Sequence, residues 1–275
     1  MGLKLKKIIF LLALSFLVHS NTWPADYCAN SNMKAAYYLN ESSGTLADCT
    51  SNANTCTATN SPGAYNQTGQ FGGAFDFQEV NNSFLSCGSA ASIDNLTSKS
   101  AGLWVYPDSN GNNSGSICDA QTFLGKSDGN DGWLLCQQQP SEIKFAQSFD
   151  FGRAVWTTTT APVVTTGFQH IAVTYNGSSS SNDPIIYFNG VAQSQVDASP
   201  SVTIEADAGF TFRIATEEGN LGEVDARIDE PFYYSGILTS TEVNDIKDNG
   251  LTSAGVSIVN HLFNNMIIHG GFIVL

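Results

Sequence analysis

The chain has 275 residues and a formal net charge of −14. This excess of acidic residues argues against binding to nucleic acid or to anionic membranes, because both need a basic surface. Only 4 histidines are present and the 6 cysteines have no C-x-x-C spacing, which argues against a zinc site.

Residues 1–20 are expected to be an export signal. Three lysines precede the apolar stretch Ile8–Val18, and the residues before Asn21 suit cleavage after Ser20. This stretch is shorter than the roughly 20 residues that span a bilayer, although an uncleaved anchor remains the alternative. Cleavage would remove three of the 11 basic residues, leaving 8 against 25 acidic ones and a net charge of −17. We therefore expect a secreted or cell-surface protein with one domain over residues 21–250.

The six cysteines of an exported chain predict disulfides. Cys49 and Cys56 flank a short polar loop and are the favoured pair. Cys118 with Cys136 and Cys28 with Cys87 are the other two pairs expected.

Short apolar runs separated by polar, glycine-rich segments make up most of the chain. About a dozen such runs are expected to be strands, at residues 34–39, 71–77, 83–87, 101–107, 121–125, 132–137, 142–148, 149–156, 167–177, 184–193, 210–215 and 226–236. Many short strands with a single helix predict an all-β fold, an antiparallel two-sheet sandwich.

Local motifs sharpen three of these elements. In residues 167–177 the residues alternate, with Ile171 and Val173 on one face and His170 on the other, and we expect His170 to be a packed or half-exposed strand residue. Asn189-Gly190 between two apolar runs predicts a tight hairpin. The sequence TSTE from Thr239 predicts a capped helix that ends near Gly250.

Four segments, in order, are similar to one known family. They are "AAYYLNESSGTLADCTSN", "GQFGGAFDF", "FQHIAVTYNG…IIYFNGVAQ" and "ARIDEPFYYSGILTSTEV". Together they resemble laminin G-like, concanavalin A-like jelly-roll domains over residues 34–249. The pattern departs after Phe-Asp, where "FQEVNN" replaces the usual glycine. The resemblance implies two packed antiparallel sheets, one of them concave, in a family that includes glycan-binding modules, adhesion domains and accessory domains of secreted enzymes.

Calcium is the cofactor that the resemblance implies. Related jelly rolls hold a structural calcium where the acidic turn after the first strand meets the last strand, and Asn40, Glu41 and Asp229 occupy the matching positions. The alternative is that Asp229 and Glu230 only make hydrogen bonds that close the fold. The loop Asp128–Asp131 offers a second acidic cluster, for which a plain hairpin loop is the favoured interpretation.

Catalysis is not expected. Endo-glucanases of the same superfamily carry Glu-x-Asp followed by a further Glu, and Glu223 and Asp225 resemble the first two. The third position is Arg227 or Ile228, neither of which is a carboxylic acid. Asp229 lies six residues from Glu223, roughly 20 Å along a strand.

The sequence thus predicts a non-catalytic binding module whose partner is a glycan or a cell-surface protein. A structural surface protein and a glycoside hydrolase are the alternatives. Trp104, Trp133 and Trp156 lie in expected strands and are predicted to be core or half-core residues. The tail, residues 251–275, has no charged residue and is too polar for a confident membrane span. Its role is unknown.

Overall fold

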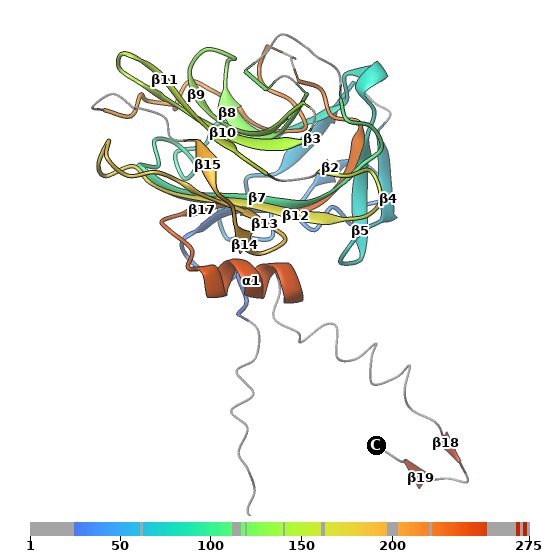
Figure 1. Ribbon diagram of the computed structural model, residues 1–275. Coiled ribbons are helices and arrows are strands. Elements are labelled where there is room, and N and C mark those ends of the chain that lie inside the picture. The colour runs from blue at the N-terminus through green and yellow to red at the C-terminus, as the bar shows by residue number, and fades with distance from the viewer. Residues whose placement is uncertain are drawn as a thin grey trace, which may run out of the picture.

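A computed structural model describes residues 25–251 except 61–62, 112–116, 119, 140, 161–162, 197–202 and 220–221, together with the backbone of 268–269 and 272–273. The expected export signal and residues 252–267 of the tail lie outside the described residues. Two antiparallel sheets stack face to face, and one helix lies below the lower sheet (Figure 1). The predicted all-β sandwich is confirmed. None of the helices in the described part of the chain is long and apolar enough to cross a bilayer.

The first sheet, next to the helix, contains eight of the described strands. Its order is β14-β13-β12-β7-β17-β5-β4, with β1 paired to β17. The strands are β1 (Met33–Ala36), β4 (Ala64–Thr68), β5 (Gly73–Phe77), β7 (Ser98–Pro107), β12 (Gln169–Asn176), β13 (Ile185–Phe188), β14 (Val191–Ala192) and β17 (Ala226–Ser235).

The second sheet contains nine described strands in the order β15-β11-β10-β9-β8-β16-β6-β3-β2. They are β2 (Thr45–Leu46), β3 (Cys56–Thr59), β6 (Phe84–Ser86), β8 (Gln121–Ser127), β9 (Gly132–Gln138), β10 (Glu142–Phe149), β11 (Gly152–Thr158), β15 (Gln195–Val196) and β16 (Phe212–Ile214). A short 3-10 helix, η1 (Glu79–Asn81), lies between β5 and β6, and the two-residue strands β18 (Ile268–His269) and β19 (Phe272–Ile273) pair in the tail.

The hydrophobic core fills the space between the sheets. Ile171 and Val173 of β12 point into it, as the alternation predicts. Trp133 and Trp156 are fully buried there, and the Trp133 ring stacks on Tyr233 with 4.8 Å between the ring centres. These two tryptophans are core residues, so neither can serve as a surface platform for a ligand.

The predicted turn and helix caps are present. Asn189 and Gly190 have positive φ values of 49° and 78°, which the tight hairpin between β13 and β14 requires. Helix α1 (Ser240–Asn249) starts with a complete capping box between Thr239 and Glu242. Both local motifs therefore form the structures that they predict.

Several short strands were missed, among them β2, β3 and β4, whose sequences carry no clear apolar alternation. β2, β3 and β4 all lie in the polar segment between residues 40 and 70, which has the composition of a loop. β2 and β4 are edge strands, where only one neighbour and one packed face are needed.

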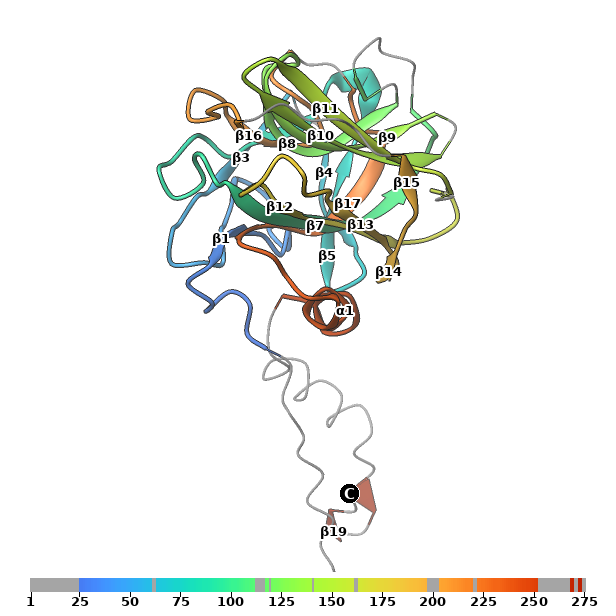
Figure 2. The same cartoon turned by 60° about the vertical axis from the view of Figure 1, so that its left-hand side comes forward.

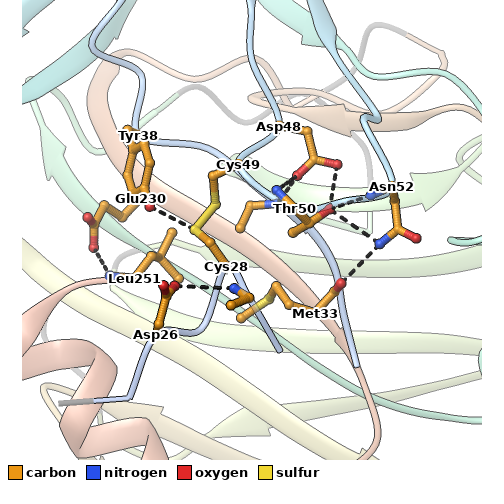
Figure 3. Close-up of a disulfide and its surroundings, with 12 residues drawn as sticks. Asp26, Cys28, Met33, Tyr38, Asp48, Cys49, Thr50, Asn52, Glu230 and Leu251 are labelled. Carbon is orange, nitrogen blue, oxygen red and sulfur yellow. Dashed lines mark hydrogen bonds between the residues drawn. A yellow bond between two sulfur atoms is a disulfide. The ribbon is translucent and has the colours of Figure 1, made fainter. Parts of the chain in front are cut away.

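The disulfides correct two of the three expected pairings. Cys118–Cys136 is confirmed, but the predicted pairs Cys49–Cys56 and Cys28–Cys87 are wrong, because the structure joins Cys28 to Cys49 and Cys56 to Cys87. Strand β3 pairs with β6 so that Cys56 comes opposite Cys87, with 4.0 Å between their Cα atoms. Cys49 is thereby left to pair with the N-terminal segment (Figure 3).

Candidate functional site

Helix α1 covers only part of the outer face of the first sheet, the face turned away from the second sheet. Phe232 and Tyr234 of β17 pack there against Val243 and Ile246 of the helix. Figure 2 shows the helix end-on, against this sheet. Beside the helix, the outer face carries two neighbouring rows of side chains.

The first row crosses β17 and β7 and reaches the residue before β12. Strand register pairs Arg227 with Tyr106 and Gln169 with Val105, which places Phe168 next to Tyr106. The Tyr106 and Phe168 ring centres are 5.6 Å apart, and the Arg227 guanidinium carbon lies 4.1 Å from the centre of the Tyr106 ring. All three side chains of this row are half-buried.

The second row contains Asp229, Trp104 and His170, which are direct neighbours on β17, β7 and β12. The Trp104 ring lies edge-on to His170 at 5.3 Å and to Phe71, from the β4–β5 turn, at 6.2 Å. Trp104 is 8% exposed, whereas Asp229 and His170 are fully buried. We refer to Phe71, Trp104, Tyr106 and Phe168 as the aromatic strip.

Four polar atoms in the second row have no hydrogen-bond partner among the described residues. They are Nε1 of Trp104, Oδ1 of Asp229 and both ring nitrogens of His170. Burial lowers the pKa of His170 to about 3, so its ring is neutral. Burial also raises the pKa of Asp229 to about 7. Buried polar groups normally have partners, so this row is suited to a hydroxyl-bearing ligand, a cation or ordered water.

Carboxylates border the strip on the side of β5 and the loop before β17. We call Asp76, Glu79, Asp108, Glu223 and Asp225 the acidic rim. Burial raises the pKa of both Asp76 and Asp108, and the charge of Asp225 raises them further, while Arg227 opposes the shift. Burial, followed by repulsion from Asp225 and Glu223, raises the pKa of Glu79. The rim is therefore a mutually repelling set of acids.

Two of the three predicted calcium ligands reach the same turn. Oδ1 of Asn40 accepts a hydrogen bond from the Gly73 amide, and Oδ2 of Asp229 accepts one from the Phe71 amide at 2.8 Å. Glu41 instead accepts from the Ala47 amide at 2.8 Å, within its own loop. No group of three His, Cys, Asp or Glu side chains suited to a metal occurs within the part of the chain that the structure describes.

Glu230 follows Asp229 in a β-bulge of β17 and has a positive φ of 47°. Its Oε2 accepts a hydrogen bond from the Leu251 amide at 2.9 Å (Figure 3), and the Leu251 carbonyl accepts one from the Tyr27 amide at 3.0 Å. Burial, with the neighbouring Asp229, raises the pKa of Glu230 to about 8. The Asp229–Glu230 pair thus holds the β4–β5 turn on one side and the end of α1 on the other.

The remaining acidic candidates have structural explanations. Oδ1 of Asp128 accepts hydrogen bonds from the Asn130 and Asp131 amides at 2.9 Å and 2.8 Å, so this cluster closes the β8–β9 hairpin. Glu223 and Asp225 precede β17 in an irregular segment, so the Glu-x-Asp pair does not lie on a strand.

Sequence reasoning missed Phe71, Tyr106, Phe168 and Arg227 as members of one site. Trp104 and Tyr106 are two residues apart on a strand and so share a face, but the neighbours of that face depend on strand order. Phe71 reaches the strip only because the β4–β5 turn folds back onto Asp229.

Two antiparallel sheets with one helix packed on an outer face are the architecture of a concanavalin A-like jelly-roll domain. Residues 80–244 match the family described as the concanavalin A-like lectin/glucanases superfamily. The match covers more than half of the chain, and the chain belongs to this family.

Solved structures with this fold include several binding domains. That of Paraclostridial Mosquitocidal Protein 1 has a TM-score of 0.60 at 14% identity, covering 78% of this chain and 52% of that one. Domain 4 of AbnA, a GH43 extracellular arabinanase from Geobacillus stearothermophilus in complex with arabinotriose, has a TM-score of 0.54 at 19% identity, covering 78% and 98%. The botulinum neurotoxin serotype D binding domain has a TM-score of 0.58 at 14% identity, covering 87% and 54%.

At these identities the likeness concerns the fold. This chain spans about half the length of the mosquitocidal binding domain, at 52% of it. No curated protein matches the chain.

Proposed function

We propose that the protein is an exported, non-catalytic module that binds carbohydrate on the aromatic strip. The observation that carries the proposal is the gathering of four aromatic side chains, Phe71, Trp104, Tyr106 and Phe168, on one stretch of the first sheet. Three of these side chains are only half-buried. Sugar rings have apolar faces that pack on aromatic rings, while nearby polar groups bind the hydroxyls.

The strip has both kinds of group. Phe71 and Phe168 supply apolar surface, and Arg227 packs over Tyr106 and fixes its ring. The Trp104 indole nitrogen, buried within the strip, is a hydrogen-bond donor with no partner among the described side chains and main-chain groups. AbnA domain 4, which shares the fold, is in complex with arabinotriose, and this supports the choice of carbohydrate.

A cell-surface protein is the second candidate partner. The binding domain of botulinum neurotoxin DC, with a TM-score of 0.58 at 11% identity, is in complex with rat synaptotagmin II. Export is supported by the three disulfides, which form and persist in oxidising compartments.

We also propose a structural calcium at the β4–β5 turn, held by Asn40, Asp229 and backbone carbonyl oxygens. The buried Oδ1 of Asp229, which has no partner among the described residues, supports a cation at this place. Calcium would keep Asp229 ionised and tie the turn to β17. Glu41 is the weaker member of the predicted set, since its carboxylate closes its own loop.

A glycan array tests the main proposal. We expect the folded protein to bind at least one oligosaccharide, and Phe168→Ala and Tyr106→Ala to weaken that binding about tenfold, which is the loss of one aromatic contact. Phe151→Ala is the control, because Phe151 is 87% exposed at the tip of the β10–β11 hairpin. Binding that is unchanged in both strip variants, or no bound glycan, would overturn the proposal.

A further inference from the structure

We propose that the aromatic strip selects glycans that carry positive charge, namely oligosaccharides of amino sugars with free ammonium groups. This inference rests on the proposed carbohydrate binding and names the ligand class of the same surface. Three features support this inference. They are the acidic rim, the Arg227 guanidinium that packs on the strip, and the indole nitrogen of Trp104, which is unpaired among the described residues.

The acidic rim gives the strip a negative field. Asp76 lies directly opposite Arg227 across the β5–β17 pair, Asp108 interacts with both of them, and Asp225 interacts with Asp76 and Asp108. Glu79 interacts with Asp225 and with Glu223, and so extends the set. The five carboxylates repel one another, and Arg227 is the cation that offsets this repulsion at Asp76 and Asp108. A second cation would relieve their mutual repulsion, whereas a uronic acid or sialic acid would add to it.

The strip already accommodates a cation over its rings. The Arg227 guanidinium lies 4.1 Å from the Tyr106 ring centre and 5.5 Å from that of Phe168. Attraction between a cation and the face of an aromatic ring therefore operates here. Arg227 of β17 and Phe71 of the β4–β5 turn lie on one side of β7, and Phe168 lies on the other, beside β12.

The Trp104 indole indicates a ligand that also carries hydroxyls. Trp104 is only 8% exposed, is the residue two before Tyr106 on the same face of β7, and contacts Phe71 of the strip. Its Nε1 donor has no partner among the described residues. A simple polyamine offers this donor no acceptor. An amino sugar offers a hydroxyl for Trp104, a ring face for the aromatic side chains and an ammonium group for the rim.

Binding measurements with three oligosaccharides of equal length test the inference. The probes are an oligomer of glucosamine, its fully N-acetylated and neutral counterpart, and an oligomer of a uronic acid. We expect the glucosamine oligomer to bind about tenfold more tightly than the neutral one at low salt, and the uronic acid oligomer not to bind. The preference should shrink as salt rises to about 0.5 M, because exposed charges are then screened.

Isosteric variants identify the source of the preference. The double variant Asp108→Asn, Asp225→Asn should remove most of the preference for the glucosamine oligomer over the neutral one. Asp150→Asn, Glu142→Gln makes the same change of charge at β10 and its hairpin in the second sheet, and should leave the preference intact. Thermal unfolding of both variants verifies that they are folded.

The outcomes separate the two proposals. If no oligosaccharide binds, the proposed carbohydrate function fails. If the neutral oligomer binds as tightly as the glucosamine oligomer, or if both double variants behave alike, only the charge selection fails. A lysine pentamer is included, and tighter binding of this peptide would overturn the amino sugar assignment in favour of a basic protein partner.

Discussion

The outer face of the first sheet divides into a helix-covered area and the open aromatic strip, although both use β17 and β7. In the covered area, Phe232 and Tyr234 meet apolar side chains of α1. On the strip, Arg227 and Asp229 of the same strand stand beside aromatic side chains of β7. The two ends of β17 therefore have different roles. One end packs against α1 and stabilises the fold, and the other carries polar side chains beside the aromatic strip.

The bulge at Glu230 makes this division possible. Before it, alternation places Arg227 and Asp229 on the outer face, and strict alternation would continue with residues 231 and 233. The register shifts between Asp229 and Phe232, so Phe232 faces α1 and Tyr233 faces the sandwich core. One extra residue thus reverses the faces of the strand.

The largest expected loss of stability comes from a substitution in the helix-covered area. Phe232→Ala should lower the free energy of unfolding by about 3 to 5 kcal/mol, because it leaves a cavity under α1. Tyr106→Ala on the half-buried strip should lower it by about 1 kcal/mol. Urea unfolding of the two variants measures this contrast. Equal losses would show that the strip is as much a part of the core as the covered area is.

The next effect is a dependence on pH at the bulge, measured in chelator. Folding raises the pKa of Asp229 to about 7 and that of Glu230 to about 8. Because the folded state holds these protons more tightly, their contribution is complete below about pH 4 and is lost as the pH rises towards 8. Glu230→Gln should therefore be about 2 to 4 kcal/mol more stable than the wild type at pH 8.5.

At pH 4 the variant and the wild type should unfold at similar temperatures, since Glu230 is then neutral in the wild type. The amide introduced by Glu230→Gln is not charged at any pH, and its oxygen can still accept from the Leu251 amide, so the hydrogen bond is preserved. A variant that is less stable than the wild type at pH 8.5 would contradict the raised pKa.

Calcium should stabilise the folded protein on the strip side of the bulge, where Asp229 lies. A ligand at 100 times its dissociation constant stabilises a folded protein by about 2.7 kcal/mol. We therefore expect the unfolding temperature of chelator-treated protein to rise when calcium is added at that concentration. Asp229→Asn and Asn40→Ala should abolish the rise, while Glu230→Gln should keep it. No shift in the wild type would rule out the calcium site.

The smallest effect concerns the start of the helix. Thr239→Ala removes the capping box and should cost about 1 kcal/mol of stability. Ser240→Ala, one residue further at an exposed position, is the control. Glycan binding should be unchanged in both, since neither contacts the strip. Weaker binding by Thr239→Ala would mean that α1 and the strip are coupled.

Local sequence determined more of the fold than of the site. Alternation around Ile171, the Asn189-Gly190 turn and the Thr239 capping box each predicted their element, because each depends on neighbours in sequence. The pairing of Cys56 with Cys87 could not be predicted, because β3 has no apolar alternation to identify it as the partner of β6.

The same limit applies to the site. Asn40 and Asp229 were expected to meet because of the family resemblance, and both do reach the β4–β5 turn. The strip depends on β7 lying between β12 and β17, an order that periodicity does not encode. Arg227, Tyr106 and Phe168 are neighbours only through that order.

The contact between Tyr27 and Leu251 has a mechanical consequence. The described domain begins and ends at one point, so tension on the chain before Tyr27 and after Leu251 would peel that contact apart first. The disulfide from Cys28 to Cys49 stands one residue behind it. Extension from the N-terminal side would therefore stop at Cys28, and load would pass to the sheet through a covalent bond. An atomic force pulling experiment would register this as a short initial extension that lengthens after reduction.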